Sequence, residues 1–132
     1  MEAVVITPES SPPAAGPYSP ALKVGEWVFL SGQGGFDPRS GQLAGSTIEE
    51  QTEQTIRNIA GLLDAAGCTL RDVVSCLVHL SDLSLFSRFN ATYGKHFQEP
   101  RPVRTTVGAS LVLGMLVEIT VVARVARSES GR

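Results

Sequence analysis

Two charged side chains stand among apolar neighbours near the C-terminal end of the sequence. Arg104 lies in the alternating run 103–109, and Glu118 follows fourteen residues later in the run 116–123. The alternation predicts two strands and places Arg104 and Thr106 on the same face of the first. A guanidinium fork suits carboxylate groups, and a carboxylate can pass protons. Both charges are therefore candidates for one shared site. The alternative is a structural Arg–Glu pair or two charges on edge strands.

Length and composition limit the classes of protein to which the chain can belong. The 132 residues, 42% of them hydrophobic, predict one domain over 1–126 and a polar tail at 127–132. A net charge of −2 and the lack of a basic run make nucleic acid an unexpected partner. No apolar run is long enough to cross a membrane, and the first residues lack a signal-peptide pattern. Cys68 and Cys76 form neither a Cys-x-x-Cys motif nor a disulfide framework, so we expect a soluble cytoplasmic protein.

The rest of the chain predicts the elements that must position these side chains. Thr47 and Glu50 form a capping box that starts a first helix, and Gly67 is placed to end it. Its expected buried stripe is Ile48, Thr52, Thr55, Ile56, Ile59, Leu62, Leu63 and Ala66. Ser81-Asp82 is expected to cap a second helix with the stripe Phe86, Phe89, Asn90, Tyr93 and Phe97. Expected strands cover 3–6, 19–23, 26–31, 73–80, 103–109 and 116–123.

This order of elements favours an α+β fold with a single mixed sheet of about six strands and two helices packed on one face. The helix between the strands 73–80 and 103–109 implies a crossover, and therefore one parallel pair. The strand 26–31 alternates on both faces with apolar residues, so we expect both of its sides to be covered. The last two strands are apolar on much of the face away from the helices, which indicates self-association.

Short motifs follow one another from residue 16 to residue 126. They are Gly16-Pro17-Tyr18-Ser19-Pro20-Ala21, Ser31-Gly32-Gln33, Thr52-Glu53-Gln54-Thr55 with Asn58, Asn90 with Tyr93, Pro102-Val103-Arg104-Thr105-Thr106-Val107 with Leu111 and Gly114, and Val117-Glu118-Ile119. In this order the motifs resemble the Rid family, also called YjgF-like, of small imine and enamine deaminases. The resemblance spans nearly the whole chain.

The resemblance implies a chorismate-mutase-like fold and a homotrimer whose sites lie in clefts between subunits. It implies hydrolysis of small 2-imino acids to 2-keto acids and ammonia. The implied substrates are 2-iminopropanoate and 2-iminobutanoate, which arise from enamine tautomers. No metal and no cofactor is implied.

The resemblance also implies roles for individual residues. Arg104 anchors the substrate carboxylate, and the Thr106 amide helps to hold it. Glu118 holds and activates water and relays protons. Tyr18 forms a wall of the pocket, with a hydroxyl that reaches the ligand. The residues that supply the loop backbone closing the pocket are Ser31 and Gly32.

Several of these positions have structural interpretations that the sequence leaves open. Tyr18 can simply fill a turn. Asn90 and Tyr93 can tie the second helix to nearby loops, and Glu53 and Gln54 can be surface or subunit-contact residues. His79 and His96 have no cysteine or carboxylate at ligand spacing, so no metal site is expected.

Three positions depart from the family pattern. Thr106 stands where many of the deaminases have cysteine, which excludes thiol chemistry there. Val112 replaces a proline after Leu111, which can loosen the following loop. Gly34-Gly35 replaces a more apolar stretch, so the width of the pocket and the preferred imino acid can differ.

Other functions would use the same residues differently. A non-catalytic module that senses 2-keto acids needs Arg104 but no proton relay by Glu118. The RNA-cleaving activity ascribed to some family members is disfavoured by net acidity and by the lack of clustered basic and aromatic residues. The sequence does not distinguish a pathway-specific enzyme that acts on a larger imine or enamine from an enzyme with a general housekeeping role.

Overall fold

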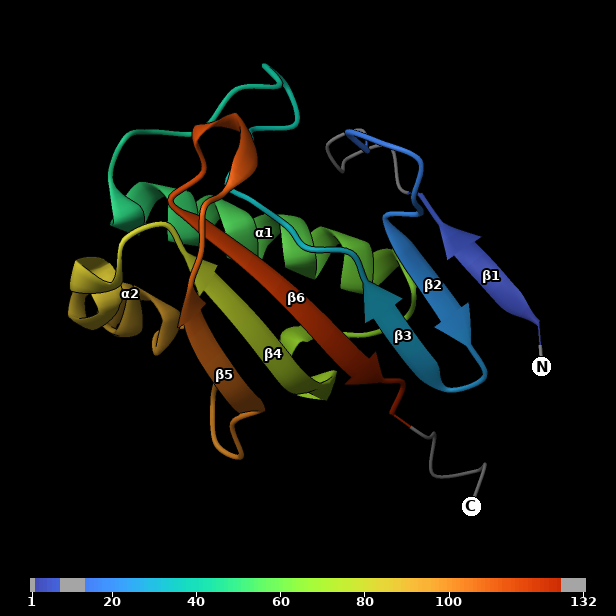
Figure 1. The fold of residues 1–132 in the computed structure, drawn as a ribbon. Coiled ribbons are helices and arrows are strands. Elements are labelled where there is room, and N and C mark those ends of the chain that lie inside the picture. The colour runs from blue at the N-terminus through green and yellow to red at the C-terminus, as the bar shows by residue number, and fades with distance from the viewer. Residues whose placement is uncertain (1, 8–13, 127–132) are drawn as a thin grey trace.

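Two helices cover one face of a mixed six-stranded sheet (Figure 1). The computed structural model describes residues 2–7 and 14–126; the tail expected at 127–132 lies outside the described residues. The elements are β1 (Ala3–Ile6), β2 (Ala21–Val24), β3 (Trp27–Leu30), α1 (Ile48–Ala65), β4 (Val73–Leu80), α2 (Phe86–Tyr93), β5 (Val103–Gly108) and β6 (Val117–Arg124). The strand order is β1-β2-β3-β6-β4-β5, which confirms the predicted α+β class.

The parallel pair expected from the crossover is present between β4 and β5, and all other pairs are antiparallel. Strand β6 returns to the middle of the sheet between β3 and β4. The expected strands 19–23 and 26–31 leave Val24-Gly25 as the turn between them. The turn between β2 and β3 instead falls at Gly25-Glu26, because Val24 still pairs with Trp27. Gly25 supplies the positive φ of 61° that such a tight turn requires.

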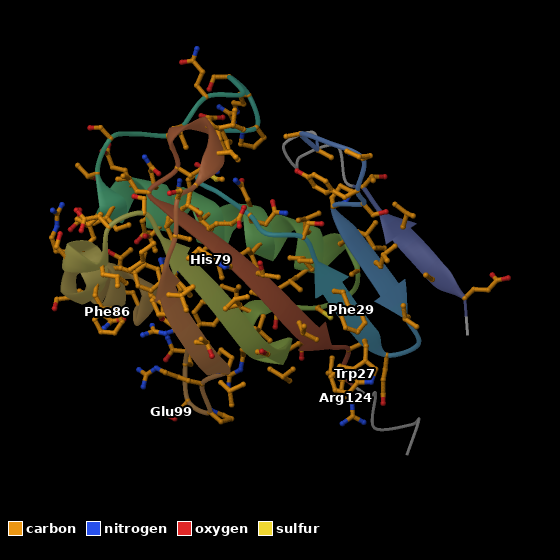
Figure 2. All side chains as sticks on the ribbon, viewed as in Figure 1. Trp27, Phe29, His79, Phe86, Glu99 and Arg124 are labelled. Atoms are coloured by element: carbon orange, nitrogen blue, oxygen red, sulfur yellow. The ribbon has the colours of Figure 1, made fainter. Side chains whose placement is uncertain are left out.

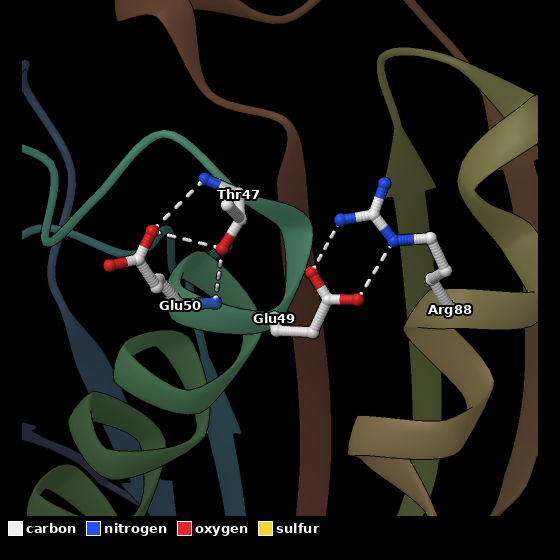
Figure 3. Close-up of polar contacts among 4 residues, drawn as sticks. All are labelled: Thr47, Glu49, Glu50 and Arg88. Carbon is white, nitrogen blue, oxygen red and sulfur yellow. Dashed lines mark hydrogen bonds and ion pairs between the residues drawn. The ribbon is translucent and has the colours of Figure 1, made fainter.

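Helix α1 follows the prediction at both ends. The hydroxyl of Thr47 accepts a hydrogen bond from the Glu50 amide at 3.1 Å, and the Glu50 carboxylate accepts one from the Thr47 amide at 3.3 Å (Figure 3). At the C-terminus Gly67 has a φ of +83°, and the Cys68 amide donates back to the Leu63 carbonyl at 2.8 Å. All eight residues of the predicted stripe are buried.

The second helix is shorter than its apolar pattern predicts. The Asp82 carboxylate accepts from the Ser84 amide and so caps a short 3-10 turn, Leu83–Leu85, which precedes α2. After α2 the chain turns, yet the apolar stripe continues through side-chain stacking. The ring of Tyr93 lies 4.5 Å from that of Phe97, and both side chains are buried.

The face of the sheet away from the helices, called the open face below, is apolar and uncovered within one chain. Val28 and Leu30 of β3 point to the helices and are buried. Trp27 and Phe29 point the other way and remain 39% and 44% exposed, so the expectation that both sides of this strand are covered is wrong for a single chain (Figure 2). Val103 on β5 is 72% exposed. An apolar face of this extent is the kind of surface through which proteins associate.

No helix within 2–7 and 14–126 combines the length and the apolar character that a membrane crossing needs.

A bidentate ion pair joins the start of α1 to α2. The Nε and Nη2 atoms of Arg88 donate to the two carboxylate oxygens of Glu49 at 2.8 and 2.6 Å (Figure 3). This hydrogen bonding to Arg88 lowers the pKa of Glu49 from its ordinary value of 4.5 to about 2. Because the folded pKa lies below the unfolded one, the pair stabilises the fold above about pH 4.5, and this contribution is lost as the pH falls toward 2.

We expect Glu49→Gln to lower the midpoint of thermal unfolding at pH 7, since it removes the charge that holds the two helices together. The difference from wild type should shrink below pH 4.5 and with added salt, because both side chains are about half exposed. Circular dichroism melts at several pH values measure it. Glu99→Gln is the matched control, because Glu99 pairs at 2.8 Å only with its loop neighbour Arg101. An equal fall of the unfolding midpoint in both variants would contradict a stabilising link between the helices through the Glu49–Arg88 pair.

Candidate functional site

Glu118 lies on the open face of β6, beside a loop that approaches it closely. The amides and carbonyls of Gln33 and Ile119 form two hydrogen bonds of 2.9 Å, which hold residues 31–36 against β6. Gly32 therefore faces the Glu118 carboxylate directly: a Cβ at position 32 would lie 2.6 Å from the Glu118 Cδ. Glycine at this position allows the loop to reach the carboxylate without displacing it.

A cavity of about 280 Å³ opens at this carboxylate. Its walls come from the segment 14–20, the loop 32–41 and the loop 112–115, and most of them are apolar. The side chains that matter for its chemistry and shape are Tyr18, Phe36, Val112, Leu113, Met115 and Glu118. Val112 and Leu113 are 69% and 63% exposed and form an apolar rim. Neither of these two residues nor Met115 was predicted from the sequence as a site residue.

Tyr18 and Ser31 are placed differently from one another. Tyr18 lines the cavity, as expected of a wall residue, and its hydroxyl accepts a hydrogen bond from the Ala15 amide at 3.1 Å. Ser31 lies behind the wall, where its hydroxyl donates to the Ser19 carbonyl at 2.7 Å and its amide donates to the Pro20 carbonyl. Ser31 thus fastens the segment that carries Tyr18 to the end of β3.

Gly34 and Gly35, which depart from the family pattern, allow two close approaches. A Cβ on Gly35 would lie 2.6 Å from the Gln51 carbonyl of α1, and one on Gly34 would collide with the Met115 sulfur. Larger residues at these positions would push the loop away from the helix. The glycines therefore let this loop pack against α1 and let Met115 occupy the wall of the cavity.

Two buried polar residues of α1 hold the loops that frame the cavity. The Asn58 amide donates to the carbonyls of Gly34 and Phe36 at 3.1 and 2.8 Å. Gln51 donates to the Gly45 carbonyl at 3.0 Å, and its side-chain oxygen accepts from the amide of Leu116 at 2.8 Å. The sequence contains a signal for this role, because both side-chain amides fall on the buried side of α1, among mostly apolar residues.

Arg104 lies on the opposite face of the sheet from this cavity. It pairs with Cys76 in the β4–β5 register, and Cys76 is buried beneath the helices. Its Nη2 atom donates to the side-chain oxygen of Asn90 at 2.8 Å. Aromatic rings of α2 surround the guanidinium, at 4.8 Å from the Tyr93 centroid and 5.5 Å from that of Phe89.

These contacts assign Asn90 and Tyr93 a role that the sequence analysis did not foresee. Both were interpreted as ties between the second helix and nearby loops, but both contact Arg104 on β5. Burial raises the pKa of the Tyr93 phenol and of the Cys76 thiol, so both groups stay neutral beside the guanidinium. The Asn90 oxygen and the ring faces hold the Arg104 side chain in one orientation.

Thr106 shares the face of β5 with Arg104, two residues further along. Its hydroxyl is buried and has no hydrogen-bond partner within the described part of the chain. The group that the resemblance assigns to ligand binding is the Thr106 amide. Arg104 and Thr106 thus form one polar spot on β5, separate from the cavity at Glu118.

Within one chain the candidate site residues therefore fall into two separate groups, called half-sites below, whereas the family resemblance implies a site in a cleft between subunits. Tyr18, Gly32 and Glu118 meet at the cavity on the open face, while Arg104 and Thr106 lie under α2 on the other face. A site that uses both halves needs a second copy of the chain.

The remaining candidates have partners of their own. The Glu53 carboxylate lies 2.8 Å from the His96 Nε2, so Glu53 is tied to the end of the α2 region rather than left to solvent. Gln54 donates to the Asn58 side chain at 2.9 Å. His79 lies 4.0 Å from Glu118. Among the described residues no three His, Cys, Asp or Glu side chains gather into a group that could hold a metal ion.

Known proteins resemble this chain over nearly all of its length. Residues 8–125 match the family model described as Endoribonuclease L-PSP. A RutC family protein of Saccharolobus solfataricus is 44% identical over 94% of this chain and 98% of its own. The 2-iminobutanoate/2-iminopropanoate deaminase of Mus musculus is 39% identical over 90% of this chain and 89% of its own.

A solved structure points to the same family as the two sequence relatives. The structure of RidA from the Antarctic bacterium Psychrobacter matches this fold with a TM-score of 0.89 and 39% identity, over 92% of this chain and 98% of the other. The chain therefore belongs to the Endoribonuclease L-PSP family, which is the Rid or YjgF-like family that its motifs resemble.

Proposed function

We propose that this protein hydrolyses reactive 2-imino acids to 2-keto acids and ammonia, at a site that two subunits complete. The observation that carries the proposal is the pair of half-sites, one a preoriented guanidinium and the other a carboxylate in an apolar cavity. The mouse relative named 2-iminobutanoate/2-iminopropanoate deaminase supports this chemistry. The proposed substrates are 2-iminopropanoate and 2-iminobutanoate, and no cofactor is required.

In the proposed site Arg104 anchors the substrate carboxylate. Two parallel N–H groups of a guanidinium match the two oxygens of a carboxylate. Asn90 occupies only the Nη2 side, and the aromatic rings fix the plane of the fork. The orientation is thus set before the ligand arrives, which reduces the entropy lost on binding. The neighbouring Thr106 amide can donate to the same carboxylate.

Glu118 of the other subunit carries the protons of the reaction. Water oxygen bonds to the carbon of the protonated imine while one water proton passes to Glu118, and the C=N π electrons move to nitrogen. Glu118 then gives that proton to nitrogen. The hydroxyl proton passes to Glu118 as the C=O bond forms and the C–N bond breaks, with its electron pair leaving on ammonia. Ammonia takes the last proton, which leaves ammonium, the keto acid and ionised Glu118.

The other residues of the cavity confine the substrate. Tyr18 covers one side and keeps its hydroxyl near the ligand, while Gly32 lets the loop backbone lie against Glu118. Ser31 supports this arrangement from behind the wall. The apolar surroundings favour binding of the short alkyl side chain of the substrate and limit access by bulk water.

The proposed assembly is a homotrimer that covers the open face. This face presents apolar side chains from β3, β4 and β5, including Trp27, Phe29, Leu77 and Val103. Packing it against other copies would bury surface that a single chain leaves in water. The cytoplasmic location and the absence of nucleic-acid partners stay predictions from composition.

The first prediction from the proposed function concerns this assembly. The protein should have a mass of three times 14.0 kDa in solution, because the apolar open face favours association and the family resemblance implies a trimer. Light scattering coupled to size exclusion measures the mass. Phe29→Glu places a charge on the open face and should yield smaller species, whereas Leu83→Glu, exposed beside α2, should change the mass less. A wild-type chain that stays monomeric at micromolar concentration contradicts the two-subunit site.

The second prediction concerns the anchor. Pyruvate and 2-oxobutanoate should bind as product analogues, and Arg104→Ala should weaken binding by about 10-fold or more, since charged hydrogen bonds contribute about 1.5–3 kcal/mol. Arg104→Lys keeps the charge but loses the fork, so its affinity should lie between those of wild type and Arg104→Ala. The affinity of Asn90→Ala should lie between them too. Titration calorimetry measures the affinities. Arg71→Ala, an exposed arginine in the turn before β4, is the control. Equal affinities for wild type and Arg104→Ala would exclude Arg104 from the site.

The third prediction separates a catalyst from a sensor. Glu118→Gln is nearly isosteric and should retain binding of a 2-keto acid, yet lose roughly 10²–10⁴ in turnover. Arg104→Ala should instead raise KM. The assay generates iminopropanoate from serine with a dehydratase and follows pyruvate or ammonia against a buffer control, because the imine also hydrolyses spontaneously.

Two outcomes would revise this assignment. If the wild type binds keto acids but gives no acceleration over buffer, the protein is a binding module and the deaminase proposal fails. If Glu118→Gln is as fast as wild type, another group carries the protons, and Tyr18 is the next candidate in the cavity. Glu53→Gln, which changes a carboxylate outside the cavity, controls for general effects of the substitution.

A further inference from the structure

His79 lies directly beside the carboxylate of the proposed reaction. The β4–β6 register pairs His79 with Glu118, so both side chains project from the same point of the open face. The Nδ1 atom of His79 lies 4.0 Å from the Oε1 atom of Glu118. We infer that His79 is a positioning residue that holds the Glu118 carboxylate for deamination, an inference that rests on the function proposed above.

The Nδ1 atom of His79 has no other partner. It is buried and makes no hydrogen bond within the described part of the chain, although the ring as a whole is 26% exposed. A buried polar atom without a partner is costly, and the cost falls if the atom faces an opposite charge. Nδ1 therefore carries its proton toward Glu118, because a lone pair facing a carboxylate would be repelled.

The separation of 4.0 Å is too long for a direct hydrogen bond and short enough for an electrostatic attraction between the ring N–H and the carboxylate. A small rotation of the carboxylate brings Oε1 closer to the ring. Such an attraction favours one orientation of Glu118 and leaves its second oxygen for water in the cavity.

Within the described residues of one chain, few other charges act on this pair. On β5 the register partner of His79 is the apolar Val107, and on the loop side Glu118 faces Gly32. The titratable Tyr18 lines the same cavity. Arg124 lies six residues further along β6, about 20 Å away along an extended strand. Within one chain, the contact between His79 and Glu118 is therefore the main charge interaction at this end of the open face. In the proposed assembly the partner subunit's Arg104 and the substrate carboxylate would also face Glu118.

The chain contains a matched control for this pair. His96 and Glu53 form the second His–Glu contact, at 2.8 Å, and neither residue lines the cavity. The sequence contains only these two histidines. If turnover falls because any His–Glu contact is lost, it should fall when either pair is broken. If turnover falls because Glu118 is no longer positioned, it should fall only when His79 is changed.

The kinetic test compares His79→Gln with His96→Gln in the imine assay. His79→Gln should lower kcat roughly 10-fold, less than loss of the proton carrier itself, and leave KM within about twofold because Arg104 still binds the carboxylate. His96→Gln should leave both unchanged. Equal turnover in wild type and His79→Gln overturns the inference.

A second measurement does not depend on activity. Long-range ¹H–¹⁵N spectra resolve the ring nitrogens of both histidines. Glu118→Gln should shift the Nδ1 resonance of His79 and not those of His96, and Glu53→Gln should do the reverse. An unmoved His79 resonance overturns the inference even if the wild type is an active deaminase. A shifted resonance in a protein that does not accelerate hydrolysis supports the contact and rejects the proposed function instead.

Discussion

The alternation of side chains across a pleated sheet determines what this protein can build from one chain. Arg104 pairs with Cys76 on β4, and Glu118 pairs with His79 on the same strand. Positions 76 and 79 differ by three, an odd number, so their partners project from opposite faces. The anchor thus lies under α2 with Asn90, and the carboxylate opens to the uncovered face. No rearrangement of side chains brings the two together within one sheet.

The same constraint explains how the supporting elements divide. Helix α2 supplies the oxygen and the rings that hold Arg104. Helix α1 lies on that face too, yet its Asn58 and Gln51 reach past the end of the sheet to the loops that frame the opposite cavity. Each half-site is therefore fixed by a different helix, and both helices share one hydrophobic core.

Local signals made part of this architecture predictable. The capping box and Gly67 located α1, because both depend on neighbouring residues alone. The crossover rule predicted the parallel pair of β4 and β5. The length of α2 was not predictable from its stripe, since Phe97 continues the aromatic stack after the helix has ended. Alternation within β5 and β6 was visible, but the register between strands was not, so the separation of Arg104 from Glu118 could not be deduced.

The site residues were also predictable from the sequence only in part. Motifs identified Tyr18, Gly32 and Glu118, and the structure brings these three to one cavity. The need for glycine at 34 and 35 depends on contacts with Met115 and Gln51 that are distant in sequence. His79 had no local signal, because only its register partner gives it significance.

The placement of the two half-sites on opposite faces has a consequence for how the activity would be controlled. A monomer would hold every residue of the proposed site and still lack the site itself. Activity would then follow mass action, rising with protein concentration until the assembly is saturated. A newly made chain would be inert at low abundance. The open face would act as the element that switches on catalysis, with no effector other than the protein itself.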